Sequence, residues 1–301
     1  MHFLAVLNRD GGTLRTTDLD AFGKRMTETL EAAGHTLEIR LVSGSDIESA
    51  LAAAARSRQA DVVIAGGGDG TASAAAAALA GKNKLLAILP AGTMNLFARS
   101  LGLPLQLDAA VAAFATGREK AVDVASANGR IFVHQFSIGM HAKMVHLREK
   151  MDFGSRWGKI RASARAALNT FMNPPDMKVE LTIGDALMRT ESIGIGVTNN
   201  LFGEGHLPYA DDPAGGILGI YVTTAKRRGQ VVRFLLNMAR GRWNRNDQVE
   251  IHETHAAVLK VPHNRKFRCV IDGELGELSR ETRFEIRPGV LKVLVPSDAP
   301  A

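Results

Sequence analysis

The chain has 301 residues, of which 46% are apolar and 23% charged, a balance typical of a globular protein with one large or two modest domains. Its net charge of +6 and pI near 9.6 favour an anionic partner, such as a nucleotide, a nucleic acid or an acidic membrane surface. Aromatic residues make up only 5%, too few for the stacking platforms of single-strand binders, so we expect no nucleic-acid partner. A single cysteine, Cys269, excludes an internal disulfide and favours a reducing, cytoplasmic compartment.

The sequence contains no stretch that predicts a transmembrane segment. No uncharged apolar run reaches the roughly 18 residues that a spanning helix needs. Residues 1–7 are apolar, but they lack the basic leader and long apolar core of a signal peptide, so they predict a first strand. We therefore expect any association with a membrane to be peripheral.

The first half of the chain alternates short apolar runs, which predict strands, with helical patterns. Thr17 is predicted to cap the first helix and Gly34 to end it, and Asp46 is predicted to open the second helix. This alternation predicts a parallel sheet with helices on both faces, whose ligands bind beyond the carboxyl ends of the strands. The predicted strands are 1–7, 37–41, 61–65 and 85–89, and the predicted helices are 19–30, 47–55, 72–80, 96–101 and one opening at Asp108.

A glycine-rich turn follows the third predicted strand. It reads Ala65-Gly66-Gly67-Gly68-Asp69-Gly70-Thr71 and leads into an alanine-rich helix. Its glycines allow positive φ angles and the close approach of a ligand. The N-terminus of the helix offers unpaired N–H groups and a positive dipole end, which suit a phosphate. Because a carboxylate would repel a bare phosphate, we expect Asp69 to hold a metal ion, directly or through water.

Two common phosphate-binding motifs do not fit this turn. A Walker loop ends in Gly-Lys-Ser or Gly-Lys-Thr, and the dinucleotide fingerprint needs a glycine where Thr71 stands. A turn whose glycines serve packing alone stays open as an alternative. Because neighbouring predicted strands end at Asn8, Ser43 and 92–95, we expect these loops to converge with the glycine turn on one site.

Beyond about residue 122 the pattern changes to apolar runs that predict strands without long helices between them. This pattern predicts a second domain that is a mainly antiparallel β-sandwich or barrel. We therefore divide the chain into an α/β domain at 1–122 and a β-sandwich domain at 123–301, whose last strand could return to the first domain. The predicted strands are 130–136, 177–183, 191–198, 216–223, 249–252, 256–261, 266–271 and 282–286.

Two basic helices are predicted to interrupt the second domain. Residues 155–172 and 230–242 each carry several cationic side chains beside apolar ones. Each helix could lie on an anionic lipid surface, where one Lys or Arg contributes roughly 1 kcal/mol to binding. The alternative is an ordinary helix that buries its apolar face on the sandwich and leaves its basic face in water.

Two motifs together resemble the diacylglycerol kinase catalytic domain family, which includes bacterial soluble lipid kinases and the sphingosine and ceramide kinases. The first motif is Gly67-Gly68-Asp69-Gly70-Thr71, and the second is Pro90-Ala91-Gly92-Thr93-Met94-Asn95-Leu96-Phe97-Ala98-Arg99. The family is distantly related in fold to NAD kinases. The resemblance implies a kinase-type α/β domain that binds ATP with Mg²⁺.

The resemblance also implies which residues contact ATP. Gly66 to Thr71 would cradle the phosphates, and Thr93, after Gly92, would contact the nucleotide. Thr93 and Asn95 have short side chains that can donate hydrogen bonds to phosphate or ribose oxygens. A turn followed by a helix cap is the alternative for both residues.

Two earlier positions complete the ATP site that the resemblance implies. Asn8 takes the place of an early Asn of the family, although Arg9 stands where a Pro usually follows. Ser43 falls where a hydroxyl residue often touches ATP.

In the second half, Val270-Ile271-Asp272-Gly273-Glu274 resembles the family's Asp-Gly-Glu motif. By this resemblance Asp272 accepts the proton of a lipid hydroxyl, and Glu274 helps if a turn or bulge brings it to the same face. An ordinary aspartate, with a pKa of about 4, cannot remove that proton fully before attack, so Asp272 would mainly orient the hydroxyl. The alternative is that Asp-Gly forms only a hairpin turn.

The chain departs from the family at two acidic positions. Leu96 stands where the second motif usually has Asp. Gly215-Gly216-Ile217-Leu218-Gly219 stands where some members hold a structural Mg²⁺ with an Asp-Gly-x-Leu-Asp-like segment. We therefore expect the structural metal site to be lost, with Asp211 and Asp212 nearby as partial substitutes.

Other chemistry has little support in the sequence. The histidines show no spacing typical of a zinc site. Ser137-Ile138-Gly139-Met140-His141 is not a nucleophile elbow. It resembles instead the family's Ser-x-Gly segment, which lies near the cleft between the domains.

Together these features predict an ATP- and Mg²⁺-dependent kinase that transfers the γ-phosphate of ATP to a lipid hydroxyl at a membrane surface. One alternative is an NAD-kinase-like enzyme, although Asn95-Leu96 lacks the Asn-Glu pair expected of that group. The other is a nucleotide- or lipid-binding homologue without catalysis, given the missing acids at Leu96 and Gly215. The identity of the lipid, diacylglycerol or a related one, and the oligomeric state, including a homodimer, stay open.

Overall fold

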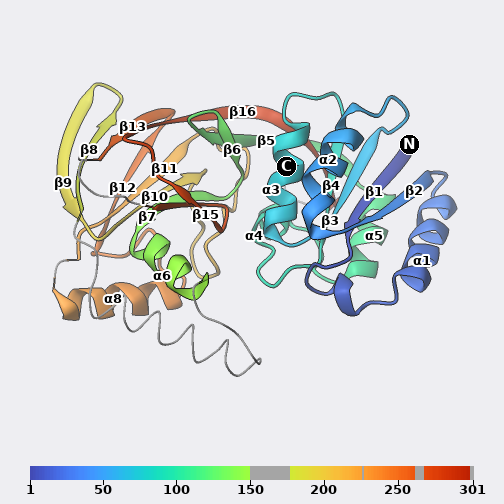
Figure 1. Cartoon of the computed structure of the whole chain (residues 1–301), viewed down its shortest axis with the longest axis horizontal. Helices are drawn as coiled ribbons and strands as arrows, with labels where there is room; N and C mark the ends of the chain where they lie inside the picture. The colour runs from blue at the N-terminus through green and yellow to red at the C-terminus, as the bar shows by residue number, and fades with distance from the viewer. Residues whose placement is uncertain (150–176, 226, 262–267, 299–301) are drawn as a thin grey trace. The chain divides into compact units, whose positions relative to one another are not determined.

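The computed structural model describes residues 1–149, 177–225, 227–261 and 268–298 (Figure 1). The chain forms two compact units. The predicted helix at 155–172 lies outside the described residues. Unit 1 consists of Met1–Val124, Asp211–Gly216 and Arg287–Ala301, and unit 2 consists of Ala125–Ala210 and Ile217–Ile286.

Unit 1 is built on the parallel sheet that the βα alternation predicts. Its strands follow the order β2-β1-β3-β4, and neighbouring strands in this order are parallel. The last part of β16 lies parallel beside β4, where Val293 pairs with Leu86. The central strands are buried nearly throughout, because helices cover both faces of such a sheet. The strands are β1 (His2–Asn8), β2 (Thr36–Val42), β3 (Val62–Gly67), β4 (Leu85–Pro90) and β16 (Glu281–Val295).

The helices of unit 1 pack in two pairs, α1 with α5 and α2 with α3. Right-handed crossovers place these pairs on opposite faces of the sheet. The small side chains Ala72, Ala75 and Ala76 are buried under α3, so this helix lies close to the strands. The helices are α1 (Leu19–Ala32), α2 (Ile47–Arg56), α3 (Asp69–Leu79), α4 (Leu96–Ser100) and α5 (Leu107–Ala115), with 3-10 turns at Leu14–Thr16 and Gly44–Asp46.

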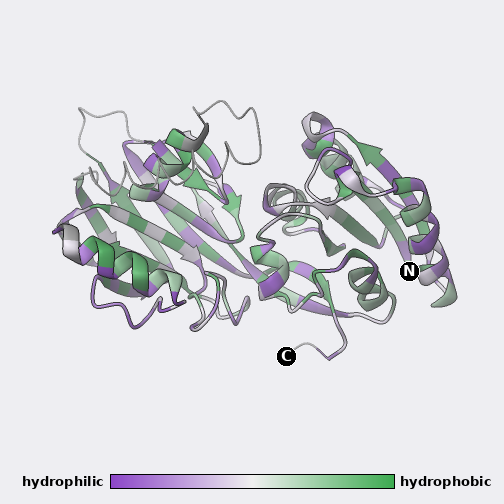
Figure 2. Cartoon of the chain, turned by 90° about the horizontal axis from the view of Figure 1, so that it is seen from below, coloured by the Kyte–Doolittle hydropathy of each residue, from purple (hydrophilic) through white to green (hydrophobic). Residues whose placement is uncertain are grey.

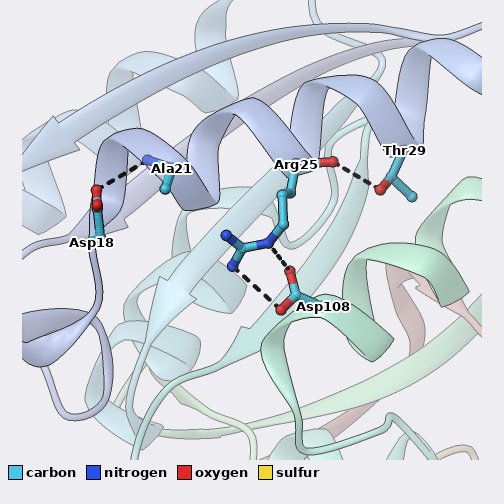
Figure 3. Close-up of polar contacts among 5 residues, drawn as sticks. All are labelled: Asp18, Ala21, Arg25, Thr29 and Asp108. Atoms are coloured by element: carbon cyan, nitrogen blue, oxygen red, sulfur yellow. Dashed lines mark hydrogen bonds and ion pairs between the residues drawn. The ribbon is translucent and has the colours of Figure 1, made fainter.

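Helix α1 is capped by Asp18, whose carboxylate accepts a hydrogen bond from the N–H of Ala21 at 3.0 Å (Figure 3). The prediction of Thr17 as the cap is wrong, because the Thr17 hydroxyl donates instead to the carbonyl of Thr13 at 2.9 Å. On the next turns of α1, Arg25 binds both carboxylate oxygens of Asp108, at 3.0 and 3.3 Å, and so ties α1 to α5.

Unit 2 is a sandwich of antiparallel sheets, which confirms the predicted fold class. One sheet has the order β12-β11-β10-β7-β14-β15, and the other contains β9, β8, β13 and the first part of β16. Phe136, Ile138 and Phe284 are fully buried between them. Strand β5 (Arg118–Ala127) begins in unit 1, and its last three residues belong to unit 2. The other strands of unit 2 are β6 (Arg130–Phe132), β7 (Gln135–Gly139), β8 (Met177–Ile183), β9 (Ala186–Ser192), β10 (Gly194–Asn199), β11 (Leu218–Thr223), β12 (Val249–Thr254), β13 (Ala256–Lys260), β14 (Arg268–Ile271) and β15 (Glu274–Glu277).

Two helices cover the outer face of the six-stranded sheet. Ala142 and Val145 of α6 (Met140–Glu149) pack on Val270 of β14. Val231 of α8 (Arg228–Ala239) packs with Ile193 beside β10. Helix α8 corresponds to the helix predicted at 230–242, whereas the sequence did not predict α6. Of the helices that the structure describes, none has the length and hydropathy of a transmembrane helix.

The run at 130–136, predicted as one strand, is divided into β6 and β7. The interruption falls at Val133 and His134, whose N–H groups donate to the Asp272 carboxylate at 2.9 and 3.0 Å. A sequence pattern of apolar residues cannot reveal this interruption, because the acceptor lies more than 130 positions away in the chain.

Candidate functional site

The loops that follow β1, β2, β3 and β4 lie at one edge of unit 1, since parallel strands end on the same side of a sheet. Hydrogen bonds join them. The N–H of Thr13 donates to the carbonyl of Ala91 at 2.8 Å, and the N–H of Gly44 donates to the Asp10 carboxylate at 2.9 Å. The loops that carry the predicted ATP-binding residues therefore form a continuous surface.

Two glycines at this edge leave no room for a side chain. A Cβ on Gly12, which has φ +45°, would lie 1.8 Å from the carbonyl oxygen of Ala91. A Cβ on Gly92 would lie 2.6 Å from the Cα of Gly68. The turns after β3 and β4 therefore pack backbone on backbone, and they present main-chain groups that a ligand can approach closely.

Helix α3 begins in the glycine turn with Gly68 as its N-cap. Gly68 has no side chain to cap the helix, so the first N–H groups of α3, at Asp69 to Thr71, have neither an intrahelical acceptor nor an N-cap side chain. Thr71 is buried, and its hydroxyl would lie only 2.2 Å from a Cβ on Gly67, so it packs beneath the turn. The partly exposed start of α3 has the geometry that suits a phosphate group.

Asp69 and Asn95 fix the shape of this edge. The two carboxylate oxygens of Asp69 accept hydrogen bonds from the N–H groups of Asn95 at 3.0 Å and Leu96 at 2.6 Å, which caps α4. Asn95 has φ +50°, and its amide binds both the N–H and the carbonyl of Gly92, at 2.8 and 2.9 Å. The structure thus gives Asn95 the role in a turn and helix start that the sequence offered as the alternative to nucleotide contact.

The fit of this edge to Mg²⁺ depends on Asp69. Among the residues that the structure describes, no group of three or more His, Cys, Asp or Glu side chains could hold a metal ion. Each oxygen of Asp69 accepts one N–H and retains acceptor capacity. Asp69 therefore fits a Mg²⁺ whose other ligands are phosphates and waters, which is how nucleotide enzymes usually hold this ion. Its role as a metal ligand stays a prediction.

The remaining ATP candidates differ in exposure and partners. Thr93 is exposed in the turn after β4. Asn8 accepts a hydrogen bond from the N–H of Asp10 at 3.1 Å, and the Ser43 hydroxyl donates to Asp46 at 2.5 Å. Both of these side chains therefore organise their own loops, and their contact with ATP stays a prediction.

In unit 2, Asp272 and Gly273 form the two-residue turn between β14 and β15. Their φ angles are +46° and +89°, as such a hairpin turn requires. The Asp272 carboxylate is buried, and besides the N–H groups of Val133 and His134 it accepts that of Gln135 at 2.9 Å. These hydrogen bonds hold the carboxylate in one orientation at the start of β7. The hairpin turn of the alternative interpretation is therefore present, and it does not exclude a chemical role.

Glu274 does not join Asp272 in the structure. Its side chain is half exposed, and its carboxylate lies 2.7 Å from the guanidinium of Arg130. The catalytic roles of Asp272 and Glu274 stay predictions.

The glycine segment at 215–219, expected to lack a structural metal, lies beside a buried acid. Asp123 on β5 is only 2% exposed, and it accepts hydrogen bonds from the N–H groups of Gly216 at 2.7 Å and Gly289 at 2.8 Å. The carboxylate of Asp212 accepts the N–H of Ala214 at 2.9 Å within its own turn. Within unit 1, the Asp123 carboxylate therefore links the 211–216 loop to β16 by accepting hydrogen bonds from main-chain N–H groups.

A cavity of about 330 Å³ lies between the outer face of the six-stranded sheet and helices α6 and α8. Small residues form its floor, namely Ser137 of β7 and Gly194, Gly196 and Thr198 of β10. The intervening residues of these strands point into the sandwich core, because side chains alternate along a strand. The cavity exists because the floor residues do not fill the space under the helices. Its walls include Met140, Met144, Phe202, Phe234, Leu235 and Met238.

The cavity lining contains a polar cluster around His141. The Ser137 hydroxyl lies 2.6 Å from Nδ1 of His141, and the side-chain nitrogen of Gln135 lies 3.5 Å from the same atom. Burial raises the pKa of Tyr221 to about 12, so its hydroxyl is neutral. The lining contains no Asp, Glu, Lys or Arg among the described residues. Such a lining suits a mostly apolar ligand with a few polar atoms.

This cavity was not predicted from the sequence. The available signal was a pair of alternate glycines, Gly194 and Gly196, within a predicted apolar strand, since such glycines often mark a face that another group approaches. Helix α6, which carries His141 and Met144, was missing from the prediction, so nothing indicated what would cover that face.

Comparison with known proteins supports the resemblance over most of the chain. Residues 2–127 match the family model of the diacylglycerol kinase catalytic domain, and residues 134–295 match that of the YegS C-terminal NAD kinase beta sandwich-like domain. The chain belongs to the diacylglycerol kinase catalytic domain family. Several relatives carry the name probable lipid kinase YegS-like, which supports a lipid kinase family for this chain.

Two relatives illustrate the assignment. A protein of Pseudomonas savastanoi pv. phaseolicola (strain 1448A / Race 6), named probable lipid kinase YegS-like, is 30% identical over 228 residues, which are 74% of this chain and 71% of the relative. A protein of the same name from Pseudomonas aeruginosa (strain UCBPP-PA14) is 32% identical over 228 residues, 71% of this chain and 69% of the relative.

Solved structures show the same fold. A diacylglycerol kinase from Bacillus anthracis str. Sterne superposes with a TM-score of 0.72 at 19% identity, covering 99% of this chain and 98% of that chain. A second solved chain from that organism has a TM-score of 0.79 at 21% identity, with 99% and 96% covered.

We predict that Gly92→Ala weakens ATP binding at least about tenfold, because overpacking of 1–3 kcal/mol separates the two turns. The new Cβ would lie 2.6 Å from Gly68 and 2.8 Å from the amide oxygen of Asn95. Titration calorimetry with ATP and Mg²⁺ measures the effect. Gly229→Ala is the control, because no atom lies within 4 Å of its Cβ position. Unchanged ATP affinity in folded Gly92→Ala would contradict this account of the edge.

Proposed function

We propose that this protein uses ATP to phosphorylate a hydroxyl group of a lipid whose apolar chain occupies the cavity of unit 2. The observation that carries the proposal is the position of Gln135. Its side chain lines the cavity, and its N–H donates to the Asp272 carboxylate at 2.9 Å. A lipid in the cavity would therefore have its polar end near the strand end to which Asp272 is bound.

In this proposal, unit 1 holds the nucleotide. The N–H groups at the start of α3 and the main chain where Gly68 meets Gly92 bind the phosphates, and Thr93 contacts the nucleotide. Mg²⁺ bound with ATP would supply charge neutralisation at the transferred phosphate, with Asp69 as its protein ligand. The remaining contribution of unit 1 is to fix the position of the phosphates, because phosphoryl transfer depends mainly on positioning and electrostatics.

Asp272 is proposed to orient the acceptor hydroxyl and to take its proton late in the transfer. The Asp272 carboxylate accepts hydrogen bonds from the N–H groups of residues 133–135. Those bonds prevent the side chain from rotating, so the acceptor oxygen stays in one place. Glu274, paired with Arg130, would act by holding the β15 side of the turn.

The lipid acceptor and the basic character of the chain support action at a membrane surface from the cytoplasm. A net charge of +6 favours contact with anionic lipid. Diacylglycerol and related lipids with a free hydroxyl fit a cavity lined without Asp, Glu, Lys or Arg among the described residues better than acceptors that would place a charged group inside it, because burying an unpaired charge is unfavourable.

The proposal is tested with labelled ATP, Mg²⁺ and a panel of acceptors in detergent micelles. The panel contains diacylglycerol, monoacylglycerol, a sphingoid base, phosphatidylglycerol and, as a soluble acceptor, NAD. We expect label in at least one neutral lipid and none in NAD. Label in NAD alone, or ATP binding without any labelled lipid, would overturn the proposal.

Asp272→Asn is predicted to lower kcat with the labelled lipid at least about 100-fold, the usual contribution of a positioned acid or base. ATP affinity should not change, because Asp272 belongs to unit 2. Asp185→Asn, in the turn between β8 and β9, is a matched control. Because asparagine also removes an acceptor for the N–H groups at 133–135, the melting temperature is measured beside kcat. A folded Asp272→Asn variant with normal turnover would remove Asp272 from the mechanism.

Gly196→Leu is predicted to raise KM for a long-chain lipid at least about tenfold, because its side chain enters the space that the lipid chain needs. A Cβ at this position lies 3.9 Å from Tyr221, so the backbone accepts a side chain. Gly196→Ala is the control, since it adds one carbon and leaves most of the cavity open. Equal KM values for the two variants and the unmodified protein would place the lipid chain elsewhere.

A further inference from the structure

Helix α8 carries apolar side chains on two of its sides. Only one of these sides packs against the six-stranded sheet of unit 2. Val231 and Phe234 are buried against the sheet. Val232, Leu235 and Leu236 are 41%, 39% and 50% exposed. Their spacing of three and four residues places them on one face of the helix. Figure 2, which views the chain from below, shows hydrophobic colour along the side of α8 that faces the viewer.

This exposed face continues into the wall of the cavity. Leu235 is both exposed and part of the lining, and so is Met144 of α6, which is 39% exposed. Leu207, 38% exposed, precedes the lining residue Pro208. The cavity wall therefore reaches the surface among exposed apolar side chains. We name this set the apolar rim: Val232, Leu235, Leu236, Met144 and Leu207.

Cationic residues flank the exposed apolar residues of α8 along the sequence. Residues 227–247 contain six arginines and a single acid, Asp247, which pairs with Arg233 at 2.6 Å. Arg240, Arg242 and Arg245 at the end of α8 are exposed, and within the described part of the chain none of the three pairs with a carboxylate. The surface thus combines exposed leucines with a local excess of positive charge, as interfacial helices do.

We propose that the apolar rim inserts into the surface of an anionic bilayer and that the lipid enters the cavity between Leu235 and Met144. A second copy of the chain or an anionic bilayer could cover this apolar surface, and the positive charge of the nearby arginines favours the bilayer. A second copy of the chain, joined by two-fold symmetry at this face, would bring the same arginines of both copies together. An anionic bilayer provides both an apolar interior for the rim and negative head groups for the arginines. The inference rests on the proposed function for the identity of the lipid that enters, but the docking itself does not require catalysis.

The test measures binding to vesicles by flotation, without ATP. The vesicles contain phosphatidylglycerol and phosphatidylcholine in equal amounts, or phosphatidylcholine alone. The double variant Val232→Ser/Leu236→Ser should bind the anionic vesicles at least about tenfold more weakly, because it removes two side chains that insert. Neither residue lines the cavity. Leu187→Ser is the matched control, because Leu187 is 57% exposed on β9, outside the apolar rim.

The arginines are tested in the same assay. Arg240→Gln/Arg242→Gln should weaken binding to anionic vesicles about 25-fold at low salt, or about fivefold for each cation. Binding of the unmodified chain to pure phosphatidylcholine should be weak, and high salt should reduce binding to the anionic vesicles. Equal binding by the unmodified chain and the serine variant, or dissociation of a dimer caused by that variant in light scattering, would overturn the inference.

A short-chain, water-soluble diacylglycerol separates this inference from the proposed function. The serine variant should phosphorylate that lipid at the rate of the unmodified chain, but lose activity on the same head group in vesicles. Vesicle binding that depends on the rim, without activity on any lipid, would support the docking surface and refute the kinase proposal. Kinase activity in vesicles that is insensitive to the rim variants would refute the docking surface alone.

Discussion

The direct contact of two glycine backbones, Gly68 and Gly92, is the constraint on which unit 1 depends. Any side chain at Gly92 would collide with the opposite turn, so only glycine lets the loops after β3 and β4 come together. Glycine loses more conformational entropy than other residues when it is ordered. The carboxylate of Asp69 and the amide of Asn95 offset part of this loss, because Asp69 forms two hydrogen bonds across the contact and Asn95 forms two within the turn after β4. The start of α3 is partly exposed and has no capping side chain.

A carboxylate fixed by main-chain N–H groups recurs at three positions that bear on the proposed chemistry. Asp69 binds the start of α4, Asp123 joins the 211–216 loop to β16, and Asp272 binds the segment between β6 and β7. A carboxylate held in this way keeps one orientation, so no reorganisation is needed when a ligand arrives. A structural and a chemical role for such an acid are therefore compatible. The hydrogen bonds of Asp272 explain both the interruption of the strand and the fixed orientation of the carboxylate beside Gln135, which lines the cavity.

Local patterns predicted much of the fold but little of the cavity. The run before Gly66 and the alanines after Thr71 predict β3 and α3, because burial and helix propensity act over neighbouring residues. The N-cap of α1 is Asp18 and not the predicted Thr17, because two adjacent residues can each cap a helix and the Thr17 hydroxyl donates to another acceptor. The division of β6 from β7 depends on a distant carboxylate. The cavity depends on which helix covers Gly194 and Gly196, and no local pattern contains that information.

The cavity and the apolar rim are both unfavourable for the isolated protein. An unfilled apolar space forfeits contacts that larger side chains at the floor would make, and the Cβ position of Gly196 shows that a side chain could be accommodated there. Exposed leucines on α8 likewise leave apolar surface in water. In the proposed function a lipid would offset both costs, since its chain would fill the cavity while the bilayer from which it comes would cover the rim. The two features meet at Leu235, which lines the cavity and is exposed on α8, so a single residue connects the surface to the site.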